Sequence, residues 1–311
     1  MKESLTVAET ARVVATPPRV VLKMPPAVVA VVAAQIVAFW PVWRWYLARV
    51  SGAGEEAWGL LALACAAYFL WRGKADSDRP DPAKPGPAKI DADAAGRELL
   101  LPALLVVLYA ISYPLLPPLA RAAIAVTALG CTASRLRSGR PFHPSTLGLL
   151  YLSLPLIPSL QFYGGYPLRA FVAAAVAPLL RLGGYAVSRE GTSLDWAGRL
   201  IWVDAPCSGI RMLWAGLFLA CVLACLYELR PLRTVQALAA AAAVIVFGNV
   251  LRAAALFYVE AGVVAAPPWA HDYVGVVSFA AVAVLILLAV RRLRRAGRRR
   301  INSRGAAADA T

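Results

Sequence analysis

Apolar segments that approach the length needed to cross a bilayer recur along the chain, and charged or proline-rich stretches separate them. The hydrocarbon core of a membrane takes about 20 apolar residues of helix. Hydrophobic residues make up 60% of the sequence, against roughly 45–50% in typical globular domains. The sequence therefore predicts an all-α polytopic membrane protein.

We predict eight transmembrane helices, at about residues 25–47, 57–71, 99–116, 119–133, 144–162, 206–226, 234–259 and 271–290. Pro155 and Pro158 predict a kink in the fifth. Between the fifth and sixth spans, residues 166–185 are only moderately apolar, which favours a helix lying in the membrane interface. Residues 187–203 alternate between polar and apolar types with glycine breakers, which predicts a short β-hairpin or extended pair.

Three parts follow from this division: a cytoplasmic N-terminal segment at 1–24, a transmembrane domain at 25–290 and a basic cytoplasmic tail at 291–311. Residues 73–96 are rich in Pro, Asp and Lys and predict a solvated loop. The N-terminal segment lacks a long apolar core and a small-residue cleavage site, so no removable signal peptide is expected.

The net charge of +15 is unevenly placed. The termini and alternate loops on one side hold 23 of the 32 Lys and Arg residues. By the positive-inside rule this side is cytoplasmic, so both termini are expected there. The charge then serves as an orientation signal and as an anchor on membrane lipid. No nucleic-acid motif accompanies it, so no nucleic-acid partner is expected.

The segment V-D-A-P-C-S-G-I-R-M-L-W, residues 203–214, places a cysteine where an apolar run begins. Asp204 is a favoured N-cap residue and Pro206 suits a first helical turn. Cys207 is therefore expected near a helix N-terminus, with Arg211 four residues on along the same face. The helix dipole and nearby cations predict a lowered thiol pKa. The five cysteines show no metal or disulfide spacing, and neither a metal nor a cofactor is expected.

Two more chemically capable side chains reach the same depth. In the predicted topology the span at 271–290 starts on the outer side, at His271. The span before it runs outward, and Arg252 lies eighteen residues after Thr234, roughly 27 Å along a helix. A thiolate that attacks a carbonyl, a histidine that moves protons and an arginine that stabilises an oxyanion suit acyl transfer at a peptide bond.

Supporting roles are expected for three further residues: Asn249, Arg211 and Asp204. Asn249 shares a helical face with Arg252, so it would bind substrate or hold the arginine. Arg211 lies about one turn deeper than Cys207, and an arginine inside a membrane is a functional candidate. It would also suit an ion pair with Asp204 or Asp195. Asp272 directly follows His271 and points about 100° away in a regular helix, so it is not expected to be its partner.

Each catalytic candidate also has a plainer interpretation. Cys207 would then be a small buried hydrophobe. Arg252 would extend to the outer lipid headgroups, and His271 would be a polar residue at the interface. His143, the other histidine, falls on the cytoplasmic side and receives no role. The three residues at one depth are the reason for favouring catalysis.

Five motifs in order resemble the exosortase/archaeosortase family: P-S-L-Q at 158–161, S-R-E-G at 188–191, C-S-G-I-R at 207–211, N-V-L-R at 249–252 and H-D-Y-V-G at 271–275. The similarity covers roughly residues 95–290. It implies a membrane cysteine transpeptidase that cleaves C-terminal sorting tails, which hold a short motif, an apolar span and a basic cluster. Carried over by motif, the nucleophile is Cys207, the arginine Arg252 and the histidine His271. Many members have a carboxylate and an alanine directly before the cysteine, whereas Pro206 intervenes here.

We therefore expect a multi-pass protein of a prokaryotic plasma membrane, with its active site at the outer face and exported proteins with sorting tails as partners. Hydrolysis and transpeptidation differ in whether water or an amine attacks the thioester, and no residue decides between them. One alternative is a non-enzymatic assembly or transport protein, although no inverted repeat is visible. Another is an inactive family member that binds tails. The sequence does not give the oligomeric state.

Overall fold

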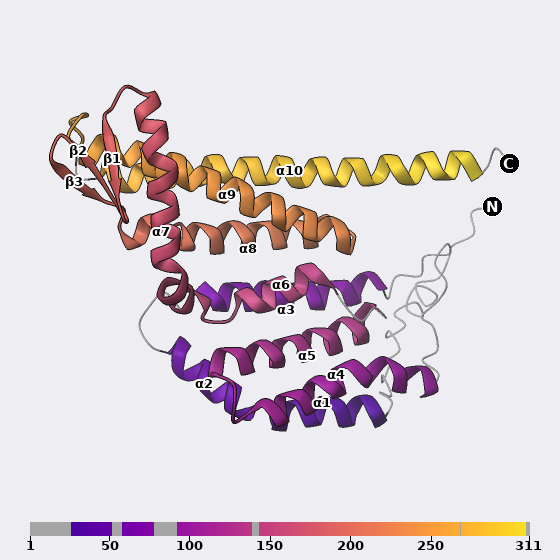
Figure 1. The fold of residues 1–311 in the computed structure, drawn as a ribbon. Coiled ribbons are helices and arrows are strands. Elements are labelled where there is room, and N and C mark those ends of the chain that lie inside the picture. The colour runs from indigo at the N-terminus through magenta and orange to yellow at the C-terminus, as the bar shows by residue number, and fades with distance from the viewer. Residues whose placement is uncertain (1–25, 52–57, 78–91, 139–142, 268, 309–311) are drawn as a thin grey trace, which may run out of the picture.

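The computed structural model describes residues 26–51, 58–77, 92–138, 143–267 and 269–308, and this part is mostly helical. Most helices lie side by side in a bundle, and a small sheet caps one end (Figure 1). The predicted N-terminal segment at 1–24 lies outside the described residues. Helix α10 begins at the end that carries the sheet, and it finishes at the opposite end (Figure 1).

The N-terminal half contains five helices, and their apolar core also takes buried side chains from residues 149–157 and 210–221. Their bounds are α1 Pro26–Ala38, α2 Trp40–Val50, α3 Trp58–Ser77, α4 Ala92–Ser112 and α5 Pro118–Ser138. The first predicted span is in fact two helices that meet at a 53° bend. The predicted loop at 73–96 is shorter than expected, because α3 continues to Ser77 and α4 starts at Ala92.

Inside this half, one polar side chain is paired across two helices. Gln35 on α1 is buried, and its amide donates a 2.8 Å hydrogen bond to the hydroxyl of Thr132 on α5. A buried amide needs such a partner, since its desolvation would otherwise go uncompensated.

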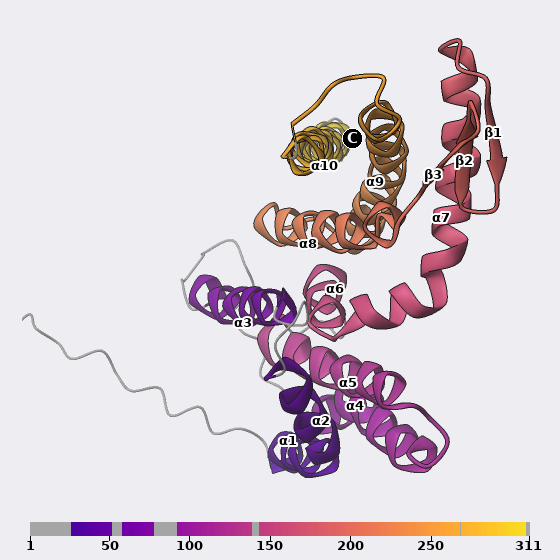
Figure 2. The ribbon, with the colours of Figure 1, turned by 90° about the vertical axis from the view of Figure 1, so that its left-hand side faces the viewer.

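The predicted kink near Pro155 is a sharp turn of the chain. Helix α6, Pro144–Leu152, and helix α7, Leu156–Leu182, meet at 85°. Helix α7 therefore crosses the end of the bundle at a steep angle to its neighbours (Figures 1 and 2). The predicted fifth span is thus cut short at Leu152, and the helix predicted at 166–185 begins ten residues earlier.

A three-stranded antiparallel sheet follows, rather than the predicted two-stranded hairpin. Strands β1 (Val187–Glu190), β2 (Ser193–Trp196) and β3 (Arg199–Trp202) are ordered β1-β2-β3. Gly191 and Gly198 have φ values of +59° and +76°, which glycine adopts without strain. The two tight turns let the chain reverse twice, and β3 leads to the cysteine segment.

The C-terminal half contains the 3₁₀ turn η3 (Ala205–Ser208), α8 (Ile210–Leu226), α9 (Pro231–Glu260) and α10 (Ala270–Ala308). Buried aliphatic side chains join these three helices in a second core. Trp214 of α8 donates a 3.0 Å hydrogen bond to the carbonyl of Leu152, which ties this half to α6. Helix α10 continues into the predicted tail as far as Ala308.

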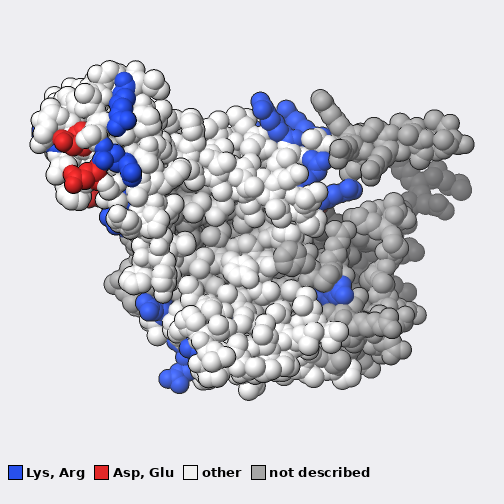
Figure 3. All heavy atoms as spheres, viewed as in Figure 1, with Lys and Arg blue, Asp and Glu red and all other residues white. Residues whose placement is uncertain are grey.

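Two helices in the described part, α9 and residues 270–296 of α10, are long and apolar enough to cross a membrane, or four spans if each bent pair counts as one. Three shorter apolar helices are Trp58–Trp71, Leu99–Ser112 and Ile210–Leu226. The eight-span topology therefore stays a prediction. Figure 3 shows a broad uncharged band between charged side chains at the sheet end and basic side chains toward the far end of α10.

Candidate functional site

The cysteine lies in a short turn of its own. Cys207 belongs to η3, and its backbone N–H donates a 2.9 Å hydrogen bond to the carbonyl of Asp204. Gly209, with φ +78°, separates this turn from α8. The thiol residue is only 6% exposed. Cys207 thus precedes α8 by three residues, which is close to the helix start expected from the sequence.

This break changes the position expected for Arg211. The four-residue spacing places two side chains on one face only within a continuous helix. Because Gly209 turns the chain, Cys207 is buried while Arg211, in the first turn of α8, is exposed. The expectation that both share a helical face is wrong. Asp204 is also exposed, at the N-cap position of η3.

Asn249 holds the cysteine turn in place. Its side chain is buried at 3% exposure, and its amide nitrogen donates a 3.0 Å hydrogen bond to the carbonyl of Cys207. A Cβ at Gly209 would lie 2.7 Å from the Asn249 amide group. The amide therefore packs directly on the turn, and only glycine leaves room for it. The sequence had suggested contact with substrate or with Arg252 instead.

The electrostatics of the thiol differ from the prediction. Cys207 lies in η3, outside the apolar helices of the described residues, although the predicted sixth span began at residue 206. Burial raises the pKa of its thiol above the ordinary value. Arg252 lowers that pKa, while Glu260 and Asp204 raise it. Desolvation is the largest effect because a thiolate loses its hydration in an apolar setting. The direction is opposite to the lowered pKa expected from the sequence, because burial outweighs the effect of Arg252.

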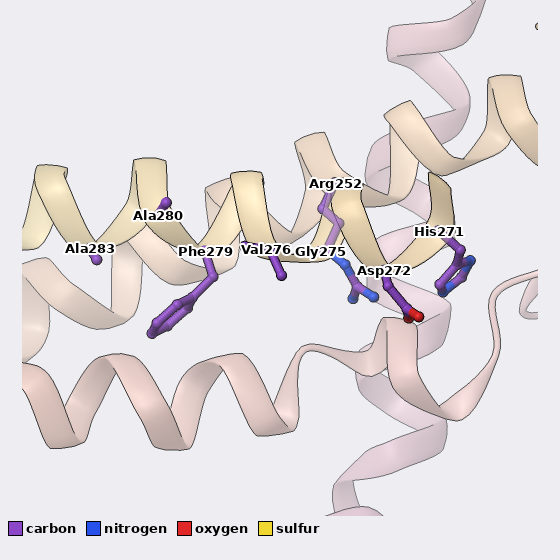
Figure 4. A pocket seen from close by; sticks show the side chains of 8 residues that line it. All are labelled: Arg252, His271, Asp272, Gly275, Val276, Phe279, Ala280 and Ala283. Carbon is purple, nitrogen blue, oxygen red and sulfur yellow. The ribbon is translucent and has the colours of Figure 1, made fainter. Parts of the chain in front are cut away.

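Arg252 lies on α9, and its guanidinium reaches the start of α10. A Cβ placed at Gly275 would lie 3.6 Å from its Nε. Arg252 also lines an open hollow of about 550 Å³, together with His271, Asp272, Gly275, Val276, Phe279, Ala280 and Ala283. The guanidinium, the imidazole and the Asp272 carboxylate gather at one end of this hollow (Figure 4). Asp272 therefore shares the pocket with His271, although adjacent residues of a helix point apart.

His271 has a partner that the sequence analysis missed. Its Nδ1 lies 3.5 Å from Oε1 of Glu260, the last residue of α9. Glu260 follows Arg252 by eight residues on the same helix, so the predicted topology would have placed it beyond Arg252, toward the outer side. The predicted span ended one residue short, at Val259, and the carboxylate was not considered.

The site thus gathers residues from η3, the end of α9 and the start of α10 at one end of the bundle (Figure 1). Arg252 acts electrostatically on Cys207 and shares a hollow with His271. Within the described residues, no group of three or more His, Cys, Asp or Glu side chains is placed to hold a metal ion. A thiol, a guanidinium, an imidazole and nearby carboxylates suit covalent acyl chemistry.

Comparison with known families gave one match: the family model described as transmembrane exosortase covers residues 28–288, which is most of the chain. The resemblance drawn from the five motifs is confirmed by this match. No curated protein and no solved structure matches the chain.

Proposed function

Because the chain belongs to the transmembrane exosortase family, we propose that it is a cysteine transpeptidase or peptidase that cleaves the C-terminal sorting tails of exported proteins through a thioester. The observation that carries the proposal is the joint placement of Cys207, Arg252 and His271 at one end of the bundle. The proposed setting is the outer face of a prokaryotic plasma membrane, with both termini cytoplasmic.

In the proposed reaction the Cys207 sulfur attacks the carbonyl carbon of the scissile peptide bond. His271 takes the thiol proton and later gives it to the leaving amine. Arg252 donates hydrogen bonds to the oxyanion that forms on the carbonyl oxygen. Water or an acceptor amine then attacks the thioester and frees Cys207. Burial raises the pKa of the Cys207 thiol, which supports the need for a base in the first step.

The shape of the hollow supports a substrate with a polar and an apolar part. Its polar end holds Arg252, His271 and Asp272, and the remainder is lined by apolar residues along α10. From His271 to Ala283 this lining follows roughly 18 Å of helix. A sorting tail would place its scissile bond at the polar end and the beginning of its own apolar span against α10. Gly275, Ala280 and Ala283 would allow the two helices to approach closely.

Asn249, Asp204 and Arg211 keep supporting roles in this proposal. Asn249 fixes the backbone of the nucleophile through its hydrogen bond to the Cys207 carbonyl. The backbone carbonyl of Asp204 accepts a hydrogen bond from the Cys207 N–H. The charge of its side chain raises the pKa of the Cys207 thiol. Arg211 is exposed beside the turn, where it would contact substrate or lipid headgroups.

The experiment that tests this function is capture of the acyl-enzyme. Purified protein in lipid nanodiscs is mixed with a synthetic tail peptide, quenched in acid and analysed by intact mass. We expect a mass increase equal to the N-terminal product fragment, localised to Cys207 and removed by hydroxylamine, as a thioester is. Cleavage by the Cys207→Ala variant, with no adduct in either protein, would exclude the thioester route.

A further inference from the structure

A contact between the Glu260 carboxylate and the His271 imidazole joins the two ends of the α9–α10 connection at the candidate site. Oε1 of Glu260 lies 3.5 Å from Nδ1 of His271. The two side chains are 36% and 41% exposed. A pair this accessible to water adds little to folding stability. The contact is therefore more relevant to the proposed reaction than to the stability of the fold.

The carboxylate contacts Nδ1 of His271, and this leaves Nε2 available for proton transfer. When the Nδ1–H of an imidazole is held by a carboxylate, the ring orientation and tautomer are fixed and Nε2 is left to accept a proton. We propose that Glu260 is a positioning residue that holds Nδ1–H of His271, so that Nε2 exchanges protons with the Cys207 thiol and the leaving amine. This inference rests on the proposed function.

One proton moves through the proposed reaction, from the Cys207 thiol to His271 and then to the leaving amine. The proton of the Cys207 S–H moves to Nε2 of His271 as the carbon–sulfur bond forms. The same proton moves from Nε2 to the amine nitrogen as the carbon–nitrogen bond breaks. Glu260 stays ionised throughout and neither gains nor loses a proton. Its charge stabilises the imidazolium that exists between the two transfers.

A second observation connects the charge of Glu260 with the Cys207 thiol. The charge of Glu260 raises the pKa of the Cys207 thiol, as does that of Asp204, whereas Arg252 lowers it. The carboxylate contacts His271, and its charge also acts on the Cys207 thiol. Removing its charge should ease ionisation of the thiol while weakening the base, and the two effects can be measured separately.

The kinetic test compares Glu260→Ala and Glu260→Gln with the wild type in nanodiscs, using a synthetic tail peptide. The matched control is Glu228→Gln, an exposed glutamate in the turn between α8 and α9 and outside the five motifs. We expect Glu260→Ala to lower kcat at least about 10-fold, below the full 10²–10⁴-fold contribution of acid–base catalysis, with KM unchanged. Glu260→Gln should recover part of the loss, because its amide oxygen still accepts Nδ1–H.

A substrate-free measurement separates positioning from general disruption. The rate of Cys207 alkylation by iodoacetamide is followed against pH. For Glu260→Gln we expect the midpoint to move to lower pH, with an unchanged plateau rate, although turnover is slower. A raised plateau would instead mean that the turn has opened, and a structural role would replace the proposal.

Wild-type kcat in both Glu260 variants, while His271→Ala is inactive, would overturn the positioning role and leave the proposed function intact. Full activity of His271→Ala would overturn the proposed function itself. A rise in KM with unchanged kcat would assign Glu260 to substrate binding and also contradict the inference.

Discussion

The side-chain amide of Asn249 donates a 3.0 Å hydrogen bond to the backbone carbonyl of Cys207. The bond joins the C-terminal half of α9 to the turn that carries Cys207. Because Asn249 is buried and Gly209 packs on it, the position of the thiol depends on a contact 42 residues away in sequence.

The first prediction concerns the fit of Gly209 against Asn249. Gly209 and Gly198 have nearly equal φ values, +78° and +76°, but a Cβ at Gly198 meets nothing within 4 Å. Each alanine variant should lose about 1–2 kcal/mol from its left-handed backbone. Gly209→Ala should lose more, since its Cβ would lie 2.7 Å from the Asn249 amide. Thermal unfolding in detergent and tail cleavage measure the difference, and equal losses in the two variants would contradict the packing argument.

The second prediction concerns the charges on the thiol. Arg252 lowers the pKa of Cys207 and Asp204 raises it. Since the thiolate is the form that alkylates, Arg252→Gln should move the alkylation midpoint of Cys207 to higher pH. Asp204→Asn should move it to lower pH. Shifts in the same direction, measured with iodoacetamide on purified protein, would show that these charges do not act on the thiol in this way.

The positions of these residues were partly predictable from the sequence. Helix lengths and the positive charge placed Cys207, Arg252 and His271 at one depth, and the structure brings η3, α9 and α10 together there. The depth of a residue along a helix does not give its direction around the helix axis. The contact of Asn249 with the Cys207 carbonyl and that of Glu260 with His271 depend on this direction and were not predicted.

The thiol pKa was mispredicted for a related reason. A helix N-terminus and cations were visible in the sequence, whereas the burial of Cys207 depends on how β3, α7 and α9 pack around it. Likewise, a proline near residue 155 predicts a kink, but the 85° turn between α6 and α7 depends on the neighbours of both helices. Local patterns indicate the elements, and packing decides their angles and solvation.

The third prediction concerns the guanidinium of Arg252. Arg252→Lys keeps the charge but loses the planar fork that can hold an oxyanion with two donors. Losing one oxyanion donor typically costs about 10²–10³ in rate. We expect a kcat loss of this order with tail binding retained, measured by peptide cleavage and by pull-down. Wild-type kcat in Arg252→Lys would mean that only the charge matters.

The fourth prediction concerns topology. A reporter fused after Arg300 should be cytoplasmic, and one inserted near Gly164 should be external, because the Lys and Arg residues are concentrated on one side. Paired alkaline phosphatase and fluorescent-protein fusions measure both positions. The reverse pattern would place Cys207 on the cytoplasmic side and would contradict a role in surface sorting.

The central claim is that Cys207 is the nucleophile. The most direct measurement is immunoblotting of an exported protein from the same cell whose C-terminus holds a short motif, an apolar span and a basic cluster. It is expressed beside the wild type, Cys207→Ala and the matched control Cys131→Ala, a buried cysteine of α5, at equal protein levels. We predict the shortened product with the wild type and Cys131→Ala and only the uncut protein with Cys207→Ala. Shortened product with Cys207→Ala would contradict the enzyme hypothesis and favour a non-enzymatic assembly role.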